Sequence, residues 1–273
     1  MEAWNKEVFR GGSMIRFVKL HIMGVKIAFA SRMVYRADFL LSSFITLLGD
    51  LIIPLITFLI YTSGASFPGW NIYEVLLIQG IFMISRGIAN MFFFGTVWNT
   101  LSSVREGTFD LILLRPHSTL HMTMITAISC DDLGVIAGGI LISGIALYNL
   151  PAPGIINILG FIFFFIVSLM VLVSFAIIMS ATVFKWVGNS RVYEIFDAIT
   201  IFGQYPATIF SKGFNILVTW VIPITMIAFI PASVLLGKAA RGIYIAALSS
   251  VVLFVMSLVI WHLMQKKYTS VGG

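Results

Sequence analysis

The sequence predicts an all-α integral membrane protein with six transmembrane helices, an N-terminal interfacial helix and a re-entrant helical hairpin between the fifth and sixth spans. The amino-acid composition indicates a membrane protein. Of the 273 residues, 59% are hydrophobic and 10% are charged, and the mean hydropathy is +1.03. Soluble proteins carry about 25% charged residues. So few charges could not cover the surface of a soluble fold of this size, so a water-soluble enzyme is nearly excluded, and disorder is excluded too.

The length of the apolar runs gives the candidate spans. A transmembrane helix needs about 20 mostly apolar residues. Five runs meet that length: Phe39–Tyr61, Val75–Thr96, Ile125–Leu147, Ile155–Val183 and Ile243–Met264. Between the fourth and the last of them, the apolar stretch Val192–Phe210 is followed by a second run, Phe214–Leu236, which Pro223 and Pro231 interrupt. This region holds one span or two.

The distribution of Lys and Arg decides between these counts, because cytoplasmic loops retain positive charge. Residues 1–38 hold seven of them, segments 97–121, 184–192 and 266–273 hold two each, and the connections at 62–72 and 149–154 hold none. We therefore expect both termini in the cytoplasm and an even number of spans, which six satisfy. Seven spans, the alternative, would place Lys266 and Lys267 on the wrong side of the membrane.

With six spans, the run Phe214–Leu236 must enter the membrane from outside and return. Lys212, Lys238 and Arg241 are then the exceptions to the charge rule. The prolines favour a broken hairpin, which must be packed against other spans because lipid cannot satisfy irregular backbone. The predicted division is a cytoplasmic arm at 1–37, a transmembrane domain at 38–265 with a loop at about 97–121 and a hairpin at about 213–237, and a cytoplasmic tail at 266–273.

The net charge of +6 orients the chain in a membrane and does not indicate nucleic acid, since most basic residues flank apolar runs. The single cysteine, Cys130, cannot form an internal disulfide, and the sequence has no Cys/His cluster for zinc or an iron–sulfur centre. We read no removable signal peptide in the basic N-terminus.

Residues Met14 to Tyr35 mix basic with apolar side chains, as expected of a helix that lies on membrane lipid in the interface. The basic residues of this candidate interfacial helix are Arg16, Lys19, Lys26 and Arg32, with Arg36 just beyond. The alternative is a basic segment that only fixes orientation.

Ionisable residues inside or at the edges of spans are expensive there, and they usually pair, face the bundle interior or mark a path. They are Asp50, Arg86, Asp131, Asp132, Glu194 and Asp197. Asp50 and Arg86 lie near the middle of adjacent antiparallel spans, so we expect an ion pair with a structural role in preference to transport. Asp131 and Asp132 fall in the first turns of the third span, where a helix N-terminus favours negative charge.

Motifs for catalysis are missing from the sequence. The paired motifs of intramembrane aspartyl proteases do not occur, and no third ligand lies near His117 and His121. There is no Gly-x-Ser-x-Gly elbow and no Gly-x4-Gly-Lys-Ser/Thr loop to bind nucleotide phosphates. We expect a chain that is not catalytic by itself and holds no metal or cofactor. A transporter built from it is either ion-driven or borrows an ATPase.

The segment Ser103–Pro116, with the sequence SVREGTFDLILLRP, resembles the cytoplasmic loop of ABC-2-type export permeases, the membrane subunits of bacterial ABC exporters. Tyr35–Leu41, with the sequence YRADFLL, resembles the start of the first span in that family. The ordered series Tyr205-Pro206, Ile222-Pro223 and Ile230-Pro231-Ala232 resembles its fifth-span and re-entrant region. The resemblance covers the chain from about Met14 to the tail.

The resemblance implies a multi-pass protein of the bacterial cytoplasmic membrane, in which two permease subunits, identical or different, bind two ATPase subunits that hold ATP and Mg. The loop would be the ATPase-coupling element, with the residues Arg105, Glu106, Gly107, Asp110, Leu113, Arg115 and Pro116. Glu106 and Asp110 favour a helix start, the leucines offer apolar contacts, and Pro116 stops the element. An ordinary amphipathic loop on the lipid headgroups is the alternative.

The expected function is the permease subunit of an ATP-driven exporter. Its re-entrant gate would contain Tyr205, Pro206, Pro223 and Pro231. Since the spans carry few fixed charges, we expect lipophilic or amphiphilic cargo in preference to a small ion. Two alternatives stay open: a self-contained ion-coupled transporter or channel that uses Asp50, Arg86 and Asp197, and a membrane scaffold that only binds partners.

Overall fold

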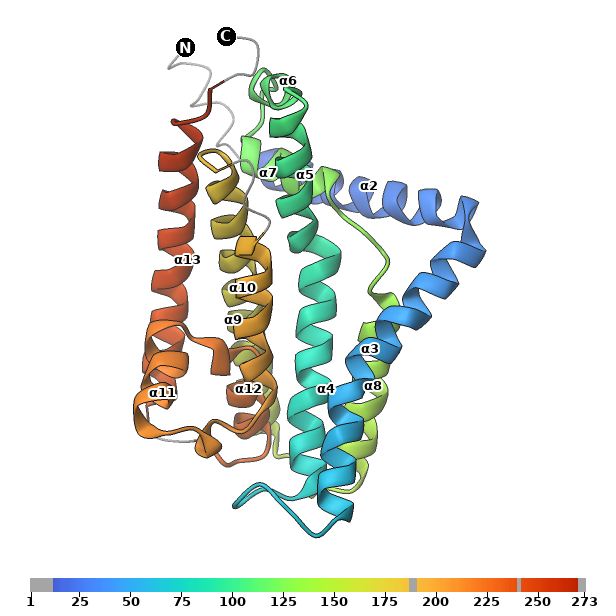
Figure 1. The fold of residues 1–273 in the computed structure, drawn as a ribbon, viewed down its shortest axis with the longest axis vertical. Coiled ribbons are helices and arrows are strands. Elements are labelled where there is room, and N and C mark those ends of the chain that lie inside the picture. The colour runs from blue at the N-terminus through green and yellow to red at the C-terminus, as the bar shows by residue number, and fades with distance from the viewer. Residues whose placement is uncertain (1–11, 187–190, 240–241, 270–273) are drawn as a thin grey trace.

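The computed structural model describes residues 12–186, 191–239 and 242–269, and within these ranges every regular element is a helix (Figure 1). Parts of the predicted N-terminal arm and tail, and Arg241, lie outside the described residues. The helices α6 (Phe109–Leu113) and α7 (Thr119–Thr126) lie at one end of the molecule. The α3–α4 connection and the short helices α11 and α12, whose bounds are given below, lie toward the other end.

Among the described residues, four helices are long and apolar enough to cross a membrane. They are α3 (Arg36–Thr62), the continuous helix Ile72–Arg105, α9 (Ile155–Val183) and α13 (Ile243–Gln265). The second comprises α4 (Ile72–Ala89), a π-helical turn η1 (Asn90–Phe94) and α5 (Gly95–Arg105). At 34 residues and 1.5 Å per residue, this helix is longer than the hydrocarbon core of a bilayer is thick. It ends at Arg105, well past the expected end at Thr96.

The predicted third span, Ile125–Leu147, is wrong at its beginning. The helix there, α8, covers Leu133–Tyr148, only 16 residues, and α7 ends at Thr126. Between them the backbone N–H of Ser129 donates to the carbonyl of Met91. The backbone of this segment therefore bonds to a neighbouring helix instead of continuing its own.

The stretch Val192–Phe210 is not one helix either. α10 (Arg191–Thr200) continues as a 3-10 turn, η2 (Ile201–Gln204), and ends at Tyr205, whose backbone is extended as steric contact with a following proline requires. Short elements follow: η3 (Ala207–Ile209), α11 (Lys212–Ile216), η4 (Leu217–Val221), η5 (Ile224–Met226) and α12 (Phe229–Leu235).

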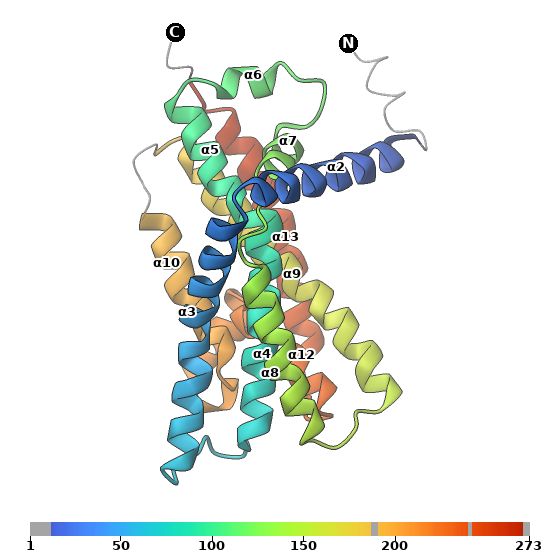
Figure 2. The same cartoon turned by 90° about the vertical axis from the view of Figure 1, so that its right-hand side faces the viewer.

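Close contact between α4 and α8 forms the centre of the bundle, and Figure 2 shows α8 lying along α4. A Cβ added to Gly80 would lie 2.3 Å from the hydroxyl of Ser143, and one added to Gly139 would lie 2.8 Å from the carbonyl of Gly80. Small residues are what lets helix backbones approach this closely in membranes. The largest buried cluster joins α4 with α9, α12 and the N-terminal part of α13.

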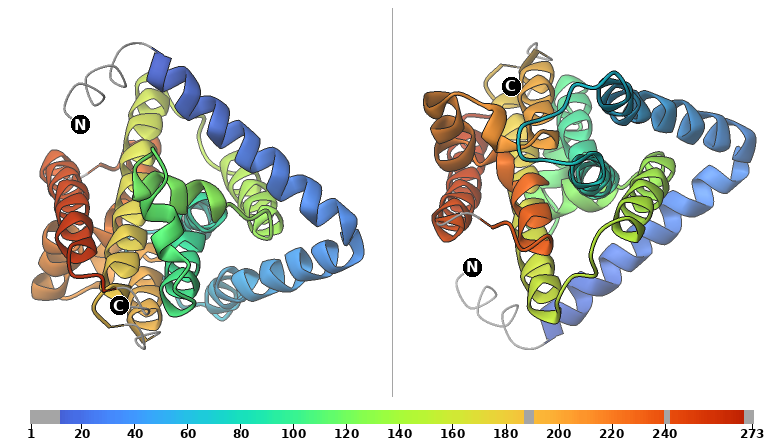
Figure 3. Two further views of the ribbon diagram at one scale, coloured as in Figure 1. Left: turned by 90° about the horizontal axis from the view of Figure 1, so that it is seen from above. Right: turned by 90° about the horizontal axis from the view of Figure 1, so that it is seen from below.

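The first helix, α2 (Gly12–Val34), departs from the bundle. It runs across the long axis at the end that carries α7, and Figure 3 shows it along one edge of the molecule, where it meets α3 at a corner. The turn between the two helices contains Tyr35. α2 is therefore placed outside the set of candidate spans.

Candidate functional site: an exposed loop, a docked arm and a charge cluster in the bundle

The loop between α5 and α7 folds back through a left-handed glycine. Glu106 is the C-cap of α5, and Gly107 follows with a φ of +70°, a conformation that favours glycine and commonly ends helices. The expected role of Glu106 at a helix start is therefore wrong. Asp110 does lie in the first turn of α6, as expected, where the helix dipole favours a carboxylate.

The short helix α6 has two different faces. Phe109 is fully buried and Ile112 is partly buried, whereas Leu111 and Leu114 are 62% and 82% exposed. The spacing of three residues within each pair puts its members on one side of a helix. The exposed side continues into Leu113, Arg115 and Pro116, which are also exposed, and Arg105 is exposed at the end of α5. The loop therefore presents leucines beside positive charge at one end of the molecule.

A second feature is the contact of α2 with α7. The imidazole of His21 stacks on that of His121, with ring centroids 4.9 Å apart and Nδ1 of His21 3.3 Å from Nε2 of His121. One turn further along, a Cβ added to Gly24 would lie 3.0 Å from a methyl group of Ile128, so α2 approaches this segment closely.

Burial and the neighbouring rings of His21 and His117 lower the pKa of His121 to about 4. The docked pair is therefore neutral at His121 at physiological pH. Protonation of His121 disfavours the stacked arrangement.

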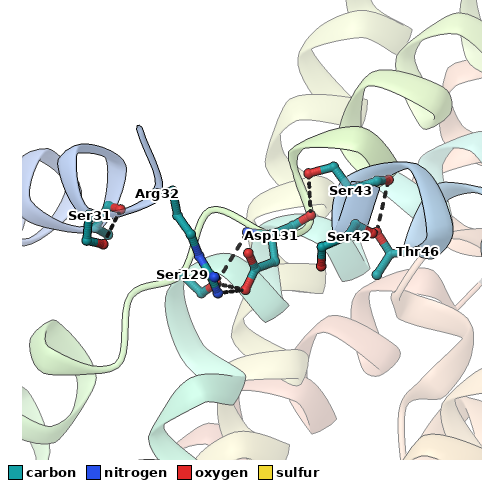
Figure 4. A network of polar contacts seen from close by, with 8 residues as sticks. Ser31, Arg32, Ser42, Ser43, Thr46, Ser129 and Asp131 are labelled. Atoms are coloured by element: carbon teal, nitrogen blue, oxygen red, sulfur yellow. Dashed lines mark hydrogen bonds and ion pairs between the residues drawn. The ribbon is translucent and has the colours of Figure 1, made fainter. Parts of the chain in front are cut away.

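Arg32 makes a second attachment of α2 (Figure 4). Its guanidinium donates to Oδ2 of Asp131, which also accepts from the hydroxyl of Ser129 at 2.8 Å. The hydroxyl of Ser43 in α3 donates to the backbone carbonyl of Asp131 at 3.1 Å. Asp131 thus connects α2, α3 and the segment before α8, which differs from the helix-start role expected of it.

The other residues of the predicted interfacial set behave differently from Arg32. Lys19, Lys26 and Arg36 are exposed, whereas the Arg32 side chain, which is 38% exposed, forms an ion pair with Asp131. Arg16 belongs to α2, but its side chain lies outside the described residues. Arg32 therefore has a protein partner, which its place in the candidate interfacial helix did not predict.

The third feature is a charge cluster at mid-bundle. The Nη2 of Arg86 in α4 donates to Oδ1 of Asp197 in α10 at 2.7 Å, and its Nη1 lies 3.7 Å from Oδ1 of Asp50 in α3. The pair that the sequence indicated between Asp50 and Arg86 is thus present. Asp197 is nevertheless the closer partner. Sequence alone could not supply this, because nothing in it fixes where α10 lies.

Asn90 extends this cluster by one turn of α4. Its amide donates to Oδ1 of Asp132 at 3.2 Å. Asp132 occupies the N-cap position of α8, so it lies at a helix N-terminus as expected, but its side chain makes no capping hydrogen bond. Glu194 is exposed on α10.

A small cleft borders the cluster, and its walls come from α4, η1, α9 and α10. The lining residues are Phe82, Arg86, Asn90, Phe94, Leu172, Tyr193, Phe196, Asp197 and Thr200. Between 23% and 35% of the Asp50, Arg86 and Asp197 side chains is exposed, so the cluster reaches the surface of the chain.

At the end of the bundle opposite the loop between α5 and α7, Lys238 links the segment after α12 to the start of α4. Its Nζ lies 2.7 Å from Oε1 of Glu74 and 5.0 Å from the centre of the Trp70 ring. The Trp70 indole in turn donates to the hydroxyl of Thr208 at 2.9 Å. Sequence reasoning missed Glu74, although Asn71 and Glu74 have the spacing of a capping box, which they form.

The four residues of the predicted gate lie near this attachment. Pro206, Pro223 and Pro231 are buried, and Tyr205 is partly buried against Phe67. Pro206 and Pro223 separate helical elements, whereas Pro231 lies in the first turn of α12, where a proline costs no helical hydrogen bond. The break expected at Pro231 is therefore wrong.

Among the described residues, no group of three or more His, Cys, Asp and Glu side chains is placed to hold a metal ion. Neither the curated proteins nor the solved structures gave a significant match to the chain. A family model described as ABC-2 family transporter protein matches residues 44–272, which covers the loop, the charge cluster and the segment around α11 and α12. The chain is a membrane protein that belongs to the ABC-2 transporter family.

Proposed function

We propose that the chain is the permease subunit of an ATP-driven exporter in the bacterial cytoplasmic membrane. The observation that carries the proposal is that α6 has one buried face and one exposed apolar face. Leu111 and Leu114 are exposed beside Arg115, while Phe109 fixes the same helix to the bundle. Exposed apolar side chains grouped with charges suit a protein partner. In this family the partner is an ABC ATPase, two copies of which would bind ATP and Mg and dock on the loops of two permease subunits.

The arrangement of the other elements supports six spans, with α3, α4–α5, α8, α9, α10 and α13 crossing the membrane and both termini in the cytoplasm. α2 would lie in the interface, since Ile22, Ile27 and Val34 are exposed on it together with Lys19 and Lys26. The short elements from α11 to α12 would form the re-entrant hairpin and the outer gate, held by Lys238 and Glu74.

The second permease subunit would cover the charge cluster. Partly exposed Asp50, Arg86 and Asp197 are costly against lipid, and intramembrane charges usually face a bundle interior or a wet cavity. We propose that these side chains face the path between two permease subunits. Because the spans carry few fixed charges, lipophilic or amphiphilic cargo is favoured over a small ion.

Native mass spectrometry of the tagged chain, extracted gently from its own cells, tests the proposal. We expect two ATPase subunits for each pair of membrane subunits, and the mass of the second membrane subunit then distinguishes a homodimer from a heterodimer. Arg115→Glu should remove the ATPase from the complex. Lys266→Glu, which reverses an exposed charge outside the loop, should retain it. Recovery of the chain alone or only with itself overturns the proposal.

A second candidate is a self-contained ion-coupled transporter, and the contact of Arg86 with two carboxylates favours keeping it. In that case the purified chain in vesicles should carry ions down a gradient without an ATPase, and Asp50→Asn should stop this flux. No flux by the wild-type chain alone rejects this candidate.

A further inference from the structure

The inner face of α6 packs against a cluster of aromatic rings. The Phe109 ring is fully buried, and its centroid lies 4.9 Å from that of the Phe184 ring and 5.1 Å from that of the Tyr268 ring. Both pairs have edge-on geometry. The Phe184 ring in turn lies 5.0 Å from the indole of Trp261. Edge-to-face pairs at these distances contribute about 0.5–1.5 kcal/mol each beyond their buried area.

These rings come from different helices. Phe184 directly follows α9, Trp261 belongs to the last turns of α13, and Tyr268 lies just beyond α13. Leu101 and Val104 of α5 complete the cluster. A single side chain of the loop therefore contacts the ends of two candidate spans at once.

The α9 helix continues from this cluster to the opposite end of the bundle. There a Cβ added to Gly160 would lie 2.7 Å from a methyl group of Val234 in α12, and the side chain of Asn157 lies close to Gly237. α9 is thus in close contact with the loop at one end and with the segment after η5 at the other.

We propose that Phe109 is the positioning residue that transmits movement of the loop to α9 and α13, and through α9 to α12. The inference rests on the proposed function, because the movement originates in the ATPase. Interiors are close-packed, so a displaced α6 displaces the rings that Phe109 contacts and cannot slide past them. The leucines of the outer face bind the partner, and Phe109 passes the displacement inward.

The test follows a cysteine at Leu236, the C-cap of α12, in a Cys130→Ala background. The purified complex of chain and ATPase is labelled with a water-soluble maleimide, with and without ATP plus vanadate. In the Phe109 background we expect ATP to change the labelling rate by at least fivefold. In Phe109→Ala the change should fall below twofold, while the ATPase still copurifies and its hydrolysis rate stays within about threefold.

Two further variants separate transmission from general damage. Phe39→Ala removes a similarly buried phenylalanine from α3, away from the aromatic cluster, and should keep the ATP response. Phe109→Met refills most of the lost volume and should restore at least half of the response. Phe109→Val is intermediate in size between the alanine and methionine variants and keeps the test decisive where Phe109→Ala fails to assemble, because its response should lie between those of Phe109→Met and the unresponsive complex.

An ATPase-bound Phe109→Ala complex with a full ATP response overturns the inference and leaves the proposed function intact. An equal loss in Phe39→Ala overturns it as well. If the wild-type chain binds no ATPase, the proposed function fails and the inference fails with it.

Discussion

At the scale of single residues, Arg86 joins three helices electrostatically, because it lies in α4 and contacts carboxylates from α3 and α10. Replacement by Met leaves Asp50 and Asp197 without their cation. Hydrogen bonds to charged groups contribute about 1.5–3 kcal/mol, so we expect Arg86→Met to lower the free energy of unfolding by about that amount. The midpoint of thermal unfolding in detergent measures the effect.

Glu194→Gln is the matched control, since this carboxylate is exposed on the same helix as Asp197. It should leave the midpoint unchanged. Asp197→Asn should cost less than Arg86→Met, because Arg86 keeps Asp50 as a partner. Equal midpoints for Arg86→Met and Glu194→Gln would show that the cluster adds no stability.

The stacked histidines give a pH dependence at the same scale. In the docked state, burial and the neighbouring rings of His21 and His117 hold the pKa of His121 at about 4, below the ordinary value of about 6.5, so the docked state binds fewer protons than a state in which His121 is exposed. By linkage, acidification favours undocking, and the contact of α2 with α7 weakens as the pH falls from about 6.5 toward 4. Its full strength is present above about 6.5.

A nitroxide at Ile27, which is 62% exposed in α2, reports this change as increased mobility at low pH. His121→Gln cannot be protonated in this range and should flatten the response. A variant that keeps the full pH response would show that His121 is not the group responsible.

Sequence predicted the residue types of these sites better than their partners. The charges at Asp50, Arg86 and Asp197 are recognisable because they interrupt apolar runs, but the closer approach of Asp197 depends on the packing of α10. Arg32 shows the converse. Its place in a basic helix suggested lipid headgroups, whereas it pairs with Asp131, about a hundred positions away in the chain.

At the scale of elements, the contact of α4 with α8 depends on glycines. A Cβ at Gly139 would lie 2.8 Å from both the carbonyl of Gly80 and a side-chain atom of Ile84, and backbone cannot move aside cheaply. We expect Gly139→Ala to push the helices apart and to destabilise the protein by about 1–3 kcal/mol, the usual cost of overpacking. Gly144→Ala provides the control on the same helix, because no atom lies within 4 Å of its added Cβ.

Thermal unfolding of the two variants in detergent compares them directly. Gly144→Ala should match or slightly exceed the wild-type midpoint, since alanine favours the helix. A midpoint for Gly139→Ala as high as that for Gly144→Ala would mean that α8 can shift away without loss, contrary to the close packing.

Long apolar elements are the ones that sequence predicted well. α3, α9 and α13 agree with the expected runs because length and composition suffice to make them helical. The irregular regions failed for a physical reason. Before α8 the backbone finds partners on η1, and after α10 two prolines remove donors, so local hydrogen bonding, which hydropathy does not measure, sets the element ends.

At the scale of the whole molecule, the number of spans determines on which side of the membrane each connection lies. In the part of the chain that the structure describes, four helices are long and apolar enough to cross, and the proposal of six adds α8 and α10, which are short. The charge rule argues for six because the connections at 62–72 and 149–154 hold no Lys or Arg.

Labelling of single cysteines in intact cells decides the topology, and Cys130→Ala removes the background because the chain has one cysteine. With six spans, a membrane-impermeant maleimide should label Ser66→Cys and Lys212→Cys from outside, and should label Lys266→Cys only after the cells are permeabilised. All three positions are exposed in the structure, so reactivity reports sidedness. Labelling of Lys266→Cys in intact cells means an odd number of spans. If Ser66→Cys reacts in intact cells but Lys212→Cys reacts only after permeabilisation, α10 does not cross the membrane. In that case the contact of Lys238 with Glu74 would have to join segments from opposite sides of the membrane. The 2.7 Å contact between those two side chains therefore argues for the outward placement of Lys212 and for the crossing of α10.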